Sequence, residues 1–337
     1  MSFEVSVAFQ TDKRASEYIR LAKLVNEYDF DAVTVYCDLP FHPSFMPLAL
    51  MAPHITRARI GVSAVPPSRI PPLDIAANGA LLEDLAPGRA YIGIARGAWL
   101  EQHGLTEDTP PVTAIREAVE VVRYLWAGRT EGYQGRVYRL APHVRALYPL
   151  PERDIPILIG TWGEKLCAVA GELASEVKVG GSANPDIVPV IQRYIAAGEQ
   201  KAGRPIGSVG VVIGAVSVID DDRKAAREAA RRAVALYLPV VAPLDPTVHV
   251  EPELIERLKQ HADRGEFEAG ARLVSDDLLD KFAFSGSAAD IIEHALRLKA
   301  AGARRVEFGT PHGLHSPDSG LHLLGKHVLP VLRHAAM

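Results

Sequence analysis

Two hydrophobic periodicities alternate along this chain, and the alternation constrains the fold more than any other feature of the sequence. Segments with strand-like alternation or β-branched residues are each followed by a segment whose apolar residues recur at helical spacing. Chains that alternate strands and helices in this way form a parallel sheet covered by helices. Eight strands are expected at residues 3–9, 32–36, 59–65, 90–95, 155–159, 176–179, 209–219 and 305–308.

Eight β/α units predict one closed (β/α)₈ TIM barrel, formed by a single domain over residues 1–337. A doubly wound open sheet is the alternative, but it predicts Gly-x-Gly-x-x-Gly after the first strand, and residues 9–12 contain no glycine. The main helices are expected at 15–28, 44–52, 73–85, 112–126, 164–173, 186–202, 223–238 and 288–300, with a closing helix at 320–335.

Two stretches interrupt the rhythm and are expected to be insertions in the barrel. The first, near 128–151, is polar and contains glycines, which indicates a small hairpin or an excursion across the barrel mouth. The second, near 240–282, contains a helical insertion over about 252–282. Loops of this kind are where barrels carry specificity.

Composition and charge narrow the class of protein. The sequence is 48% hydrophobic with a net charge of −4, which predicts a globular protein and gives no basic excess for binding nucleic acid. Cys37 and Cys167 are far apart and suggest neither a disulfide framework nor a cysteine-rich metal site. The amino terminus shows no signal peptide and no apolar run is long enough to span a bilayer, so we expect a cytoplasmic protein without a membrane partner.

Three glycine-bearing loops follow strands and are the candidate ligand-binding segments, because the active site of such a barrel lies at the carboxyl ends of its strands. They cover residues 93–100, 160–165 and 180–185. The second leads into a helix, whose free amino-terminal amides form a natural anion site. Each loop also has an ordinary explanation: tight strand-to-loop geometry for the first, and capping by Thr161 for the second. Trp99 and Trp162 are explained equally well as packing residues.

Several segments together resemble the luciferase-like superfamily, and within it methylenetetrahydromethanopterin reductase and related deazaflavin-dependent oxidoreductases. The resemblance covers nearly the whole chain. Its most specific stretches are residues 82–94, 168–174, 284–286 and 306–313.

This resemblance implies a bound deazaflavin, coenzyme F420, whose ring lies against the end of the third strand. It also implies a cis peptide bond between Ser63 and Ala64, with the phosphate-bearing tail held by the loops at 160–163 and 180–182. Arg96 could meet a phosphate or carboxylate, or form an ion pair at the rim. The expected coenzyme-binding residues are Asp38, Ser63, Ala64, Val65, Arg96, Gly97, Ala98, Gly160, Thr161, Trp162, Gly163, Gly180, Gly181 and Ser182.

Asp38 is the one candidate catalytic residue. It follows the second strand, where relatives often carry an acidic residue near the ring, although it could also cap the helix that follows. Two departures weaken an acid–base mechanism taken from relatives: Leu39 stands where histidine is common, and Ala8 where some relatives are acidic. The twelve histidines show no metal-ligand spacing, so no metal is expected; those expected nearest the mouth are His103, His312 and His315.

The resulting hypothesis is an oxidoreductase that transfers a hydride between the deazaflavin and a small organic substrate. One alternative is an FMN-dependent monooxygenase of the same fold. Another is a non-catalytic barrel that binds a flavin, although the small residues Ala64, Gly97 and Ala98 leave room for a ring and so disfavour a filled site. The resemblance and the apolar helices after strands two and three also predict a homodimer.

Overall fold

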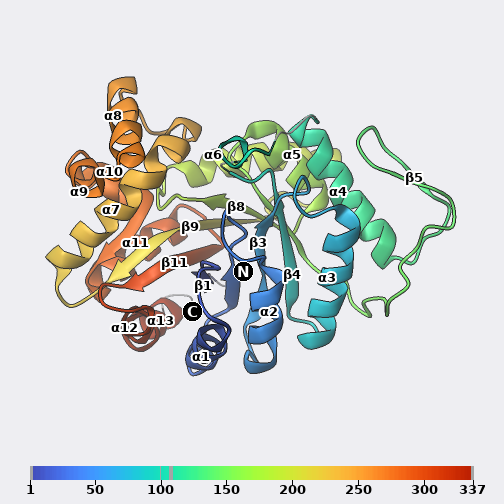
Figure 1. Ribbon diagram of the computed structural model, residues 1–337, viewed down its shortest axis with the longest axis horizontal. Helices are drawn as coiled ribbons and strands as arrows, with labels where there is room; N and C mark the ends of the chain where they lie inside the picture. The colour runs from blue at the N-terminus through green and yellow to red at the C-terminus, as the bar shows by residue number, and fades with distance from the viewer. Residues whose placement is uncertain (1–2, 99, 106–108, 335–337) are drawn as a thin grey trace.

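Eight parallel strands close into a barrel in the computed structural model, which describes residues 3–98, 100–105 and 109–334 (Figure 1). The pairings of β1 with β11 and of β8 with β9 complete the ring. The predicted TIM barrel is therefore confirmed. In order around the ring, the barrel strands are β1 (Glu4–Phe9), β2 (Ala32–Val35), β3 (Arg59–Val65), β4 (Ala90–Ala95), β7 (Ile157–Gly160), β8 (Glu176–Gly180), β9 (Gly210–Ile219) and β11 (Arg305–Gly313).

Helices form the outer layer, and most of their apolar faces pack on the strands in one large core. A second apolar cluster contains residues from 226–242 and 258–283. The helix after each barrel strand appears where the periodicity predicts it, within a few residues. The helices of the units are α1 (Ala15–Asn26), α2 (Phe45–Met51), α3 (Pro72–Leu85), α4 (Pro111–Trp126), α5 (Glu164–Leu173), α6 (Ile187–Lys201), α7 (Arg223–Val241) and α11 (Ala288–Ala300). The chain closes with α12 (Pro317–Leu323), a π-helical turn (Leu324–Val328) and α13 (Leu329–His334), and short 3₁₀ turns occur at Ala52–His54, Glu101–His103 and Ala242–Leu244.

The insertion after α7 contains three helices, within the predicted helical segment, and is followed by one strand that the sequence pattern did not predict. The helices are α8 (Pro252–Asp263), α9 (Phe267–Ala271) and α10 (Asp276–Phe282), and the strand is β10 (Ala283–Gly286). β10 pairs with Val216–Ile219 of β9, beyond the part of β9 that pairs with β8. Its four residues include alanine, serine and glycine, which have weak β-propensity, so its pairing with β9 and not its composition makes it a strand.

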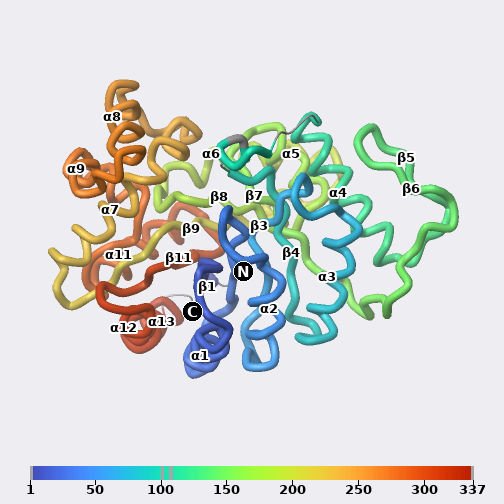
Figure 2. The backbone as a smooth tube through the Cα atoms, viewed as in Figure 1, coloured from blue at the N-terminus to red at the C-terminus, as the bar shows by residue number. Residues whose placement is uncertain are grey.

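The first insertion is a hairpin that packs on the outside of α4. Its strands are β5 (Tyr133–Gln134) and β6 (Arg139–Leu140), and Figure 2 shows them beyond α4 at the edge of the molecule. The N–H groups of residues 136–138 donate to the carboxylate of Glu117 on α4 at 2.7, 2.8 and 2.9 Å. Of the two expected arrangements, the hairpin is therefore the one present, and it lies against a helix and not across the mouth.

Charged and polar side chains fill the interior of the barrel. Parallel strands covered by helices are normally apolar on both faces, yet Glu176 and Lys178 of β8 and Arg305 and Glu307 of β11 are all buried. Arg305 pairs with Glu176 at 2.8 Å, and Lys178 pairs with Glu307. These four residues form two ionic layers, with the Lys178–Glu307 pair closer to the carboxyl ends of the strands.

No helix among the described residues is long and apolar enough to cross a membrane.

Candidate active site

Three small residues from neighbouring strands form a flat platform at the barrel mouth. Ala64 is the penultimate residue of β3, Ala95 ends β4 and Gly160 ends β7. A Cβ atom added at Gly160 would lie 3.1 Å from the Cβ of Ala95 and 3.6 Å from the Cβ of Ala64. The absence of larger side chains leaves room above these residues for a planar ligand.

The end of β3 is irregular at the platform. Its register with β4 shifts between Val62 and Val65, and the peptide bond between Ser63 and Ala64 is cis, as the family resemblance implies. Val65 is fully buried, and Ala64 is partly exposed. The Oγ of Ser63 is buried and has no hydrogen-bond partner among the described residues. The platform therefore has one polar group whose partner a ligand could supply.

The loop after β4 runs along the rim next to the platform. Arg96, Gly97 and Ala98 are exposed, and Trp99 lies outside the described residues. Gly97 has a φ of 90°, and a Cβ there would come within 3.0 Å of Pro66, so only glycine suits this approach of the two loops. The three exposed residues are thus accessible to a ligand on the platform.

The loop after β7 leads into the amino terminus of α5. Thr161 Oγ1 accepts a hydrogen bond from the Gly163 N–H at 3.0 Å, but the N-cap residue Gly163 offers no side-chain cap to the first turn of the helix. The expected capping by Thr161 is therefore only partial. The first-turn amides of α5 carry the partial positive charge of the helix terminus, which favours an anion.

The loop after β8 differs from a phosphate-binding loop in its hydrogen bonds. The N–H groups of Gly181 and Ser182 both donate to the carbonyl of Gly214, at 2.7 and 3.1 Å. Ser182 is fully buried, and its Oγ accepts from the N–H of Asn184. The N–H and the Oγ of Ser182 are thus engaged inside the protein and shape the loop, and a contact of Ser182 with the coenzyme stays a prediction.

Trp162 joins these two loops. Its indole Nε1 donates to the carbonyl of Gly180 at 3.2 Å, and its ring packs partly buried against the core. The packing interpretation of Trp162 is thereby supported, and Gly180 remains accessible at the edge of the mouth.

Asp38 lies at the mouth on the loop after β2. Its Oδ2 accepts from Gln10 Nε2 at 2.8 Å, and the N-cap of α2 is Ser44, so Asp38 does not cap that helix. Burial raises the pKa of Asp38 above its ordinary value, against the hydrogen bond from Gln10 and the charges of Lys178 and Arg69. A carboxyl group with a raised pKa beside an open platform is suited to hold or transfer a proton.

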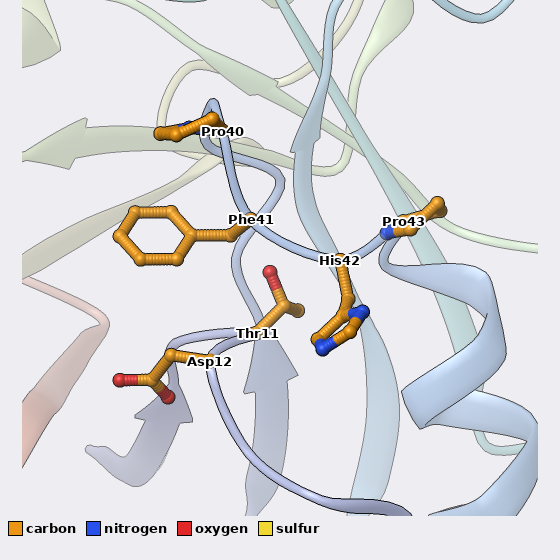
Figure 3. Close-up of a pocket in the computed structure, with 6 residues that line it drawn as sticks. All are labelled: Thr11, Asp12, Pro40, Phe41, His42 and Pro43. Carbon is orange, nitrogen blue, oxygen red and sulfur yellow. The ribbon is translucent and has the colours of Figure 1, made fainter.

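A pocket of about 340 Å³ lies between the loops after β1 and β2 (Figure 3). The Oγ1 of Thr11 is buried there without a partner among the described residues, and the ring of Phe41 is exposed. The pocket is large enough for a fragment of a small molecule. Its lining residues are Thr11, Asp12, Pro40, Phe41, His42 and Pro43.

Of the three histidines expected near the mouth, only His312 is buried. Its ring contacts Phe9 at a centroid distance of 5.1 Å, and burial lowers its pKa to about 4, so the imidazole is neutral at physiological pH. His103 and His315 are exposed. No group of three or more potential metal ligands occurs in the described part of the chain.

The polar residues beneath the mouth were not predicted from the sequence. Thr34 donates to Glu307 and is hydrogen-bonded to Tyr91, while the ammonium of Lys178 lies 4.8 Å from the centre of the Tyr36 ring. A signal for them was present, because Glu176-x-Lys178 and Arg305-x-Glu307 place charges two apart within strands. In a strand that is buried on both faces, this spacing indicates an inward-facing polar layer.

Comparisons with known proteins agree with this geometry. The model of the luciferase-like monooxygenase family matches residues 1–305. The chain is 29% identical to 5,10-methylenetetrahydromethanopterin reductase of Archaeoglobus fulgidus, over 97% of this chain and 99% of that protein. It is 27% identical to the F420-dependent glucose-6-phosphate dehydrogenase of Nakamurella multipartita, over 94% and 93% of the two chains.

Among solved structures, the coenzyme F420-dependent tetrahydromethanopterin reductase of Methanopyrus kandleri superimposes with a TM-score of 0.89. The alignment covers 98% of this chain and 100% of that one, at 24% identity, and so supports the fold. Because the family model covers most of the sequence, the chain belongs to the luciferase-like monooxygenase family.

Proposed function

We propose that this protein is an F420-dependent oxidoreductase that transfers a hydride between the coenzyme and a small organic substrate. The platform of Ala64, Ala95 and Gly160 carries the proposal, because it offers an open, flat surface at the mouth of a barrel whose curated relatives are F420-dependent enzymes. The unpartnered Oγ of Ser63 and the uncapped amino terminus of α5 fit a ligand that combines a polar ring with a phosphate.

The deazaflavin supplies a ring carbon that accepts or donates a hydride. The chain supplies position and electrostatics: Ser63 to Val65 with Gly160 support the ring, Arg96 to Ala98 border it, and residues 161–163 hold the phosphate. Gly180 and Gly181 complete the edge of the site. Asp38 faces the substrate side and holds or transfers a proton there.

A coenzyme titration tests the proposal directly. The purified protein should bind F420 with a change in coenzyme fluorescence and should bind FMN much more weakly. Preferential binding of FMN would instead support the monooxygenase alternative that the family name suggests. Binding of either coenzyme without turnover of any substrate would favour a non-catalytic barrel.

Replacing Gly163 by valine should weaken F420 binding by roughly 10-fold or more, because branched methyl groups would obstruct the first-turn amides of α5. The protein should still fold, since a Cβ at Gly163 meets only Thr161 Oγ1, at 3.8 Å. Fluorescence titration of the variant measures the effect, with Gly163→Ala as the matched control. If the variant binds F420 as tightly as the parent protein, the proposed position of the phosphate at this helix terminus is wrong.

We also propose a homodimer that pairs the outer faces of α2 and α3. Met46, Leu73 and Leu81 are 68%, 44% and 57% exposed on these helices, and a shallow groove beside Leu81 is lined by Phe45, Ala49 and Leu85. Contiguous exposed apolar side chains of this kind indicate a protein interface. Light scattering should give twice the mass of the chain, and Leu81→Glu should reduce it to the monomer mass. A monomeric parent protein would contradict the proposal.

A cytoplasmic location also remains a proposal. Its support is that the thiols of Cys37 and Cys167 are free and buried, as is usual in a reducing compartment.

A further inference from the structure

A buried ion pair lies directly beneath the candidate active site. Lys178 of β8 and Glu307 of β11 are both buried, and their ammonium and carboxylate groups are in contact. Gly214 of β9 lies between them, and a Cβ there would come within 3.2 Å of Glu307 Cβ and 3.3 Å of Lys178 Cε. Glycine at this position therefore makes room for the pair.

Lys178 reaches upward toward the mouth to make this contact. The backbone of Lys178 is in register with Val212 of β9, and Val212 is in register with Arg305 of β11. Lys178 therefore starts at the level of Arg305, which is two residues before Glu307 on the same strand. The side chain thus climbs one layer of the barrel. The layer at the height of its own backbone already contains the cation Arg305, which is paired with Glu176, so the ammonium of Lys178 pairs with Glu307 nearer the mouth.

The carboxylate of Glu307 is fixed from two further directions. Thr34 donates to its second oxygen and is itself hydrogen-bonded to Tyr91. Burial alone would raise the pKa of Glu307, but the charges of Lys178 and Arg305 outweigh it and lower the pKa. Glu307 is therefore a permanent anion that holds the Lys178 ammonium in one place.

The Tyr36 ring connects this pair to the mouth. The Lys178 ammonium lies 4.8 Å from the centre of the Tyr36 ring, an attractive cation–π contact. The hydroxyl of Tyr36 lies close to Gly309 of β11, because a Cβ added at Gly309 would come within 2.5 Å of it. The ring thus spans from β2 to β11 above Glu307 and forms the floor of the site. Asp38 follows Tyr36 by two residues.

Two cations act on the Asp38 carboxyl group, Lys178 from below and Arg69 from the loop after β3. Arg69 donates to the carbonyl of Cys37 at 2.9 Å. Because Arg69 is only half-buried, water screens its charge. Lys178 is buried and is screened much less. The other polar or titratable groups around Asp38 and Tyr36 are Gln10, Cys37, Tyr91, Tyr237 and Glu307.

We propose that Lys178 is a positioning residue of the active site: held by Glu307 beneath the Tyr36 ring, it provides a fixed positive charge that favours the ionised form of Asp38. The importance of the Lys178 charge for turnover rests on the proposed function, in which Asp38 holds or transfers a proton. The charge coupling itself is a property of the protein without coenzyme and can be measured there.

The test is a titration of the Asp38 carboxyl group in the coenzyme-free protein by ¹³C NMR of labelled aspartate, with the signal assigned by its loss in Asp38→Asn. Replacing Lys178 by methionine should move the titration of Asp38 to higher pH, because ionisation loses a favourable charge. Glu307→Gln should move it to lower pH, because the Lys178 charge is no longer compensated. In Glu307→Gln the amide oxygen can still accept from Lys178. The amide NH₂ can donate to Thr34 Oγ1, whose hydroxyl can then donate to Tyr91, so this variant should fold even if Lys178→Met does not.

Opposite shifts would support the proposal, since a general disturbance of the barrel would move both variants in the same direction. Arg69→Met is the matched control and should give a smaller upward shift than Lys178→Met. An unchanged titration in Glu307→Gln, or shifts of the same sign in Glu307→Gln and Lys178→Met, would overturn the role of Lys178. Failure of F420 to bind the parent protein would overturn the proposed function and leave this coupling measurable.

Discussion

Replacing Ala64 by phenylalanine should abolish F420 binding, with an affinity loss of at least roughly 100-fold. Overpacking a fitted site by a ring costs about 1–3 kcal/mol, and a cost near 3 kcal/mol corresponds to this factor. The new ring would occupy the space above the platform, where a Cβ at Gly160 would lie 3.6 Å from the Cβ of Ala64. Fluorescence titration with F420 measures the loss.

The fold should survive this substitution because Ala64 is partly exposed at the mouth, where a larger side chain can extend into solvent. Circular dichroism and thermal melting should therefore match the parent. Ala202→Phe is the matched control: it adds the same ring at an exposed position after α6, at the opposite end of the barrel. An Ala64→Phe protein that binds F420 as tightly as the parent would overturn the assignment of the platform.

Replacing Glu176 by methionine should lower the free energy of unfolding by about 3–5 kcal/mol, because it leaves a buried cation without its counterion. Arg305 is fully buried, and its ion pair with Glu176 is 2.8 Å long. Its Nε and one terminal nitrogen have no hydrogen-bond partner among the described residues, so the lost carboxylate has no ready replacement. Urea denaturation measures the change.

The double variant Glu176→Met/Arg305→Met should recover most of that loss, because an apolar pair of similar volume no longer carries a desolvated charge. Glu131→Met, which breaks an exposed ion pair with Arg129, should leave the stability nearly unchanged. If Glu176→Met unfolds at the same urea concentration as the parent, the lower ionic layer contributes nothing to stability. If the double variant is as unstable as the single one, the loss comes from packing and not from charge.

Much of the fold was predictable from local pattern. The bounds of β3, β4 and α5 match the sequence-based expectation residue for residue, because period-two and helical patterns report which side of each segment is buried. The general location of the site was predictable as well, since a parallel barrel brings all strand carboxyl ends to one rim. Short β10 was missed because pairing with β9, and not its own composition, makes it a strand.

The site itself was only partly predictable. Asp38, Gly160 and Gly163 were expected at the mouth and lie there, and the cis bond at Ser63–Ala64 was implied by family resemblance. Ser182 has the composition of a ligand-binding loop, but its N–H donates to Gly214 on the neighbouring strand β9. A glycine-rich sequence allows a backbone N–H to point toward a ligand, but it does not determine which acceptor that N–H bonds to in the folded protein.

By itself, the sequence determined the order of strands and helices, the barrel and the rim on which function is placed, because these follow from periodicity and from the geometry of parallel strands. Tertiary structure decided which distant side chains meet. Lys178 and Glu307 are separated by 129 residues, and only the closure of the barrel brings their charges together. The same closure places the Tyr36 ring above that pair and beneath the mouth. β2, β8 and β11 are not neighbours in the sheet, so their side chains meet only across the interior of the completed ring.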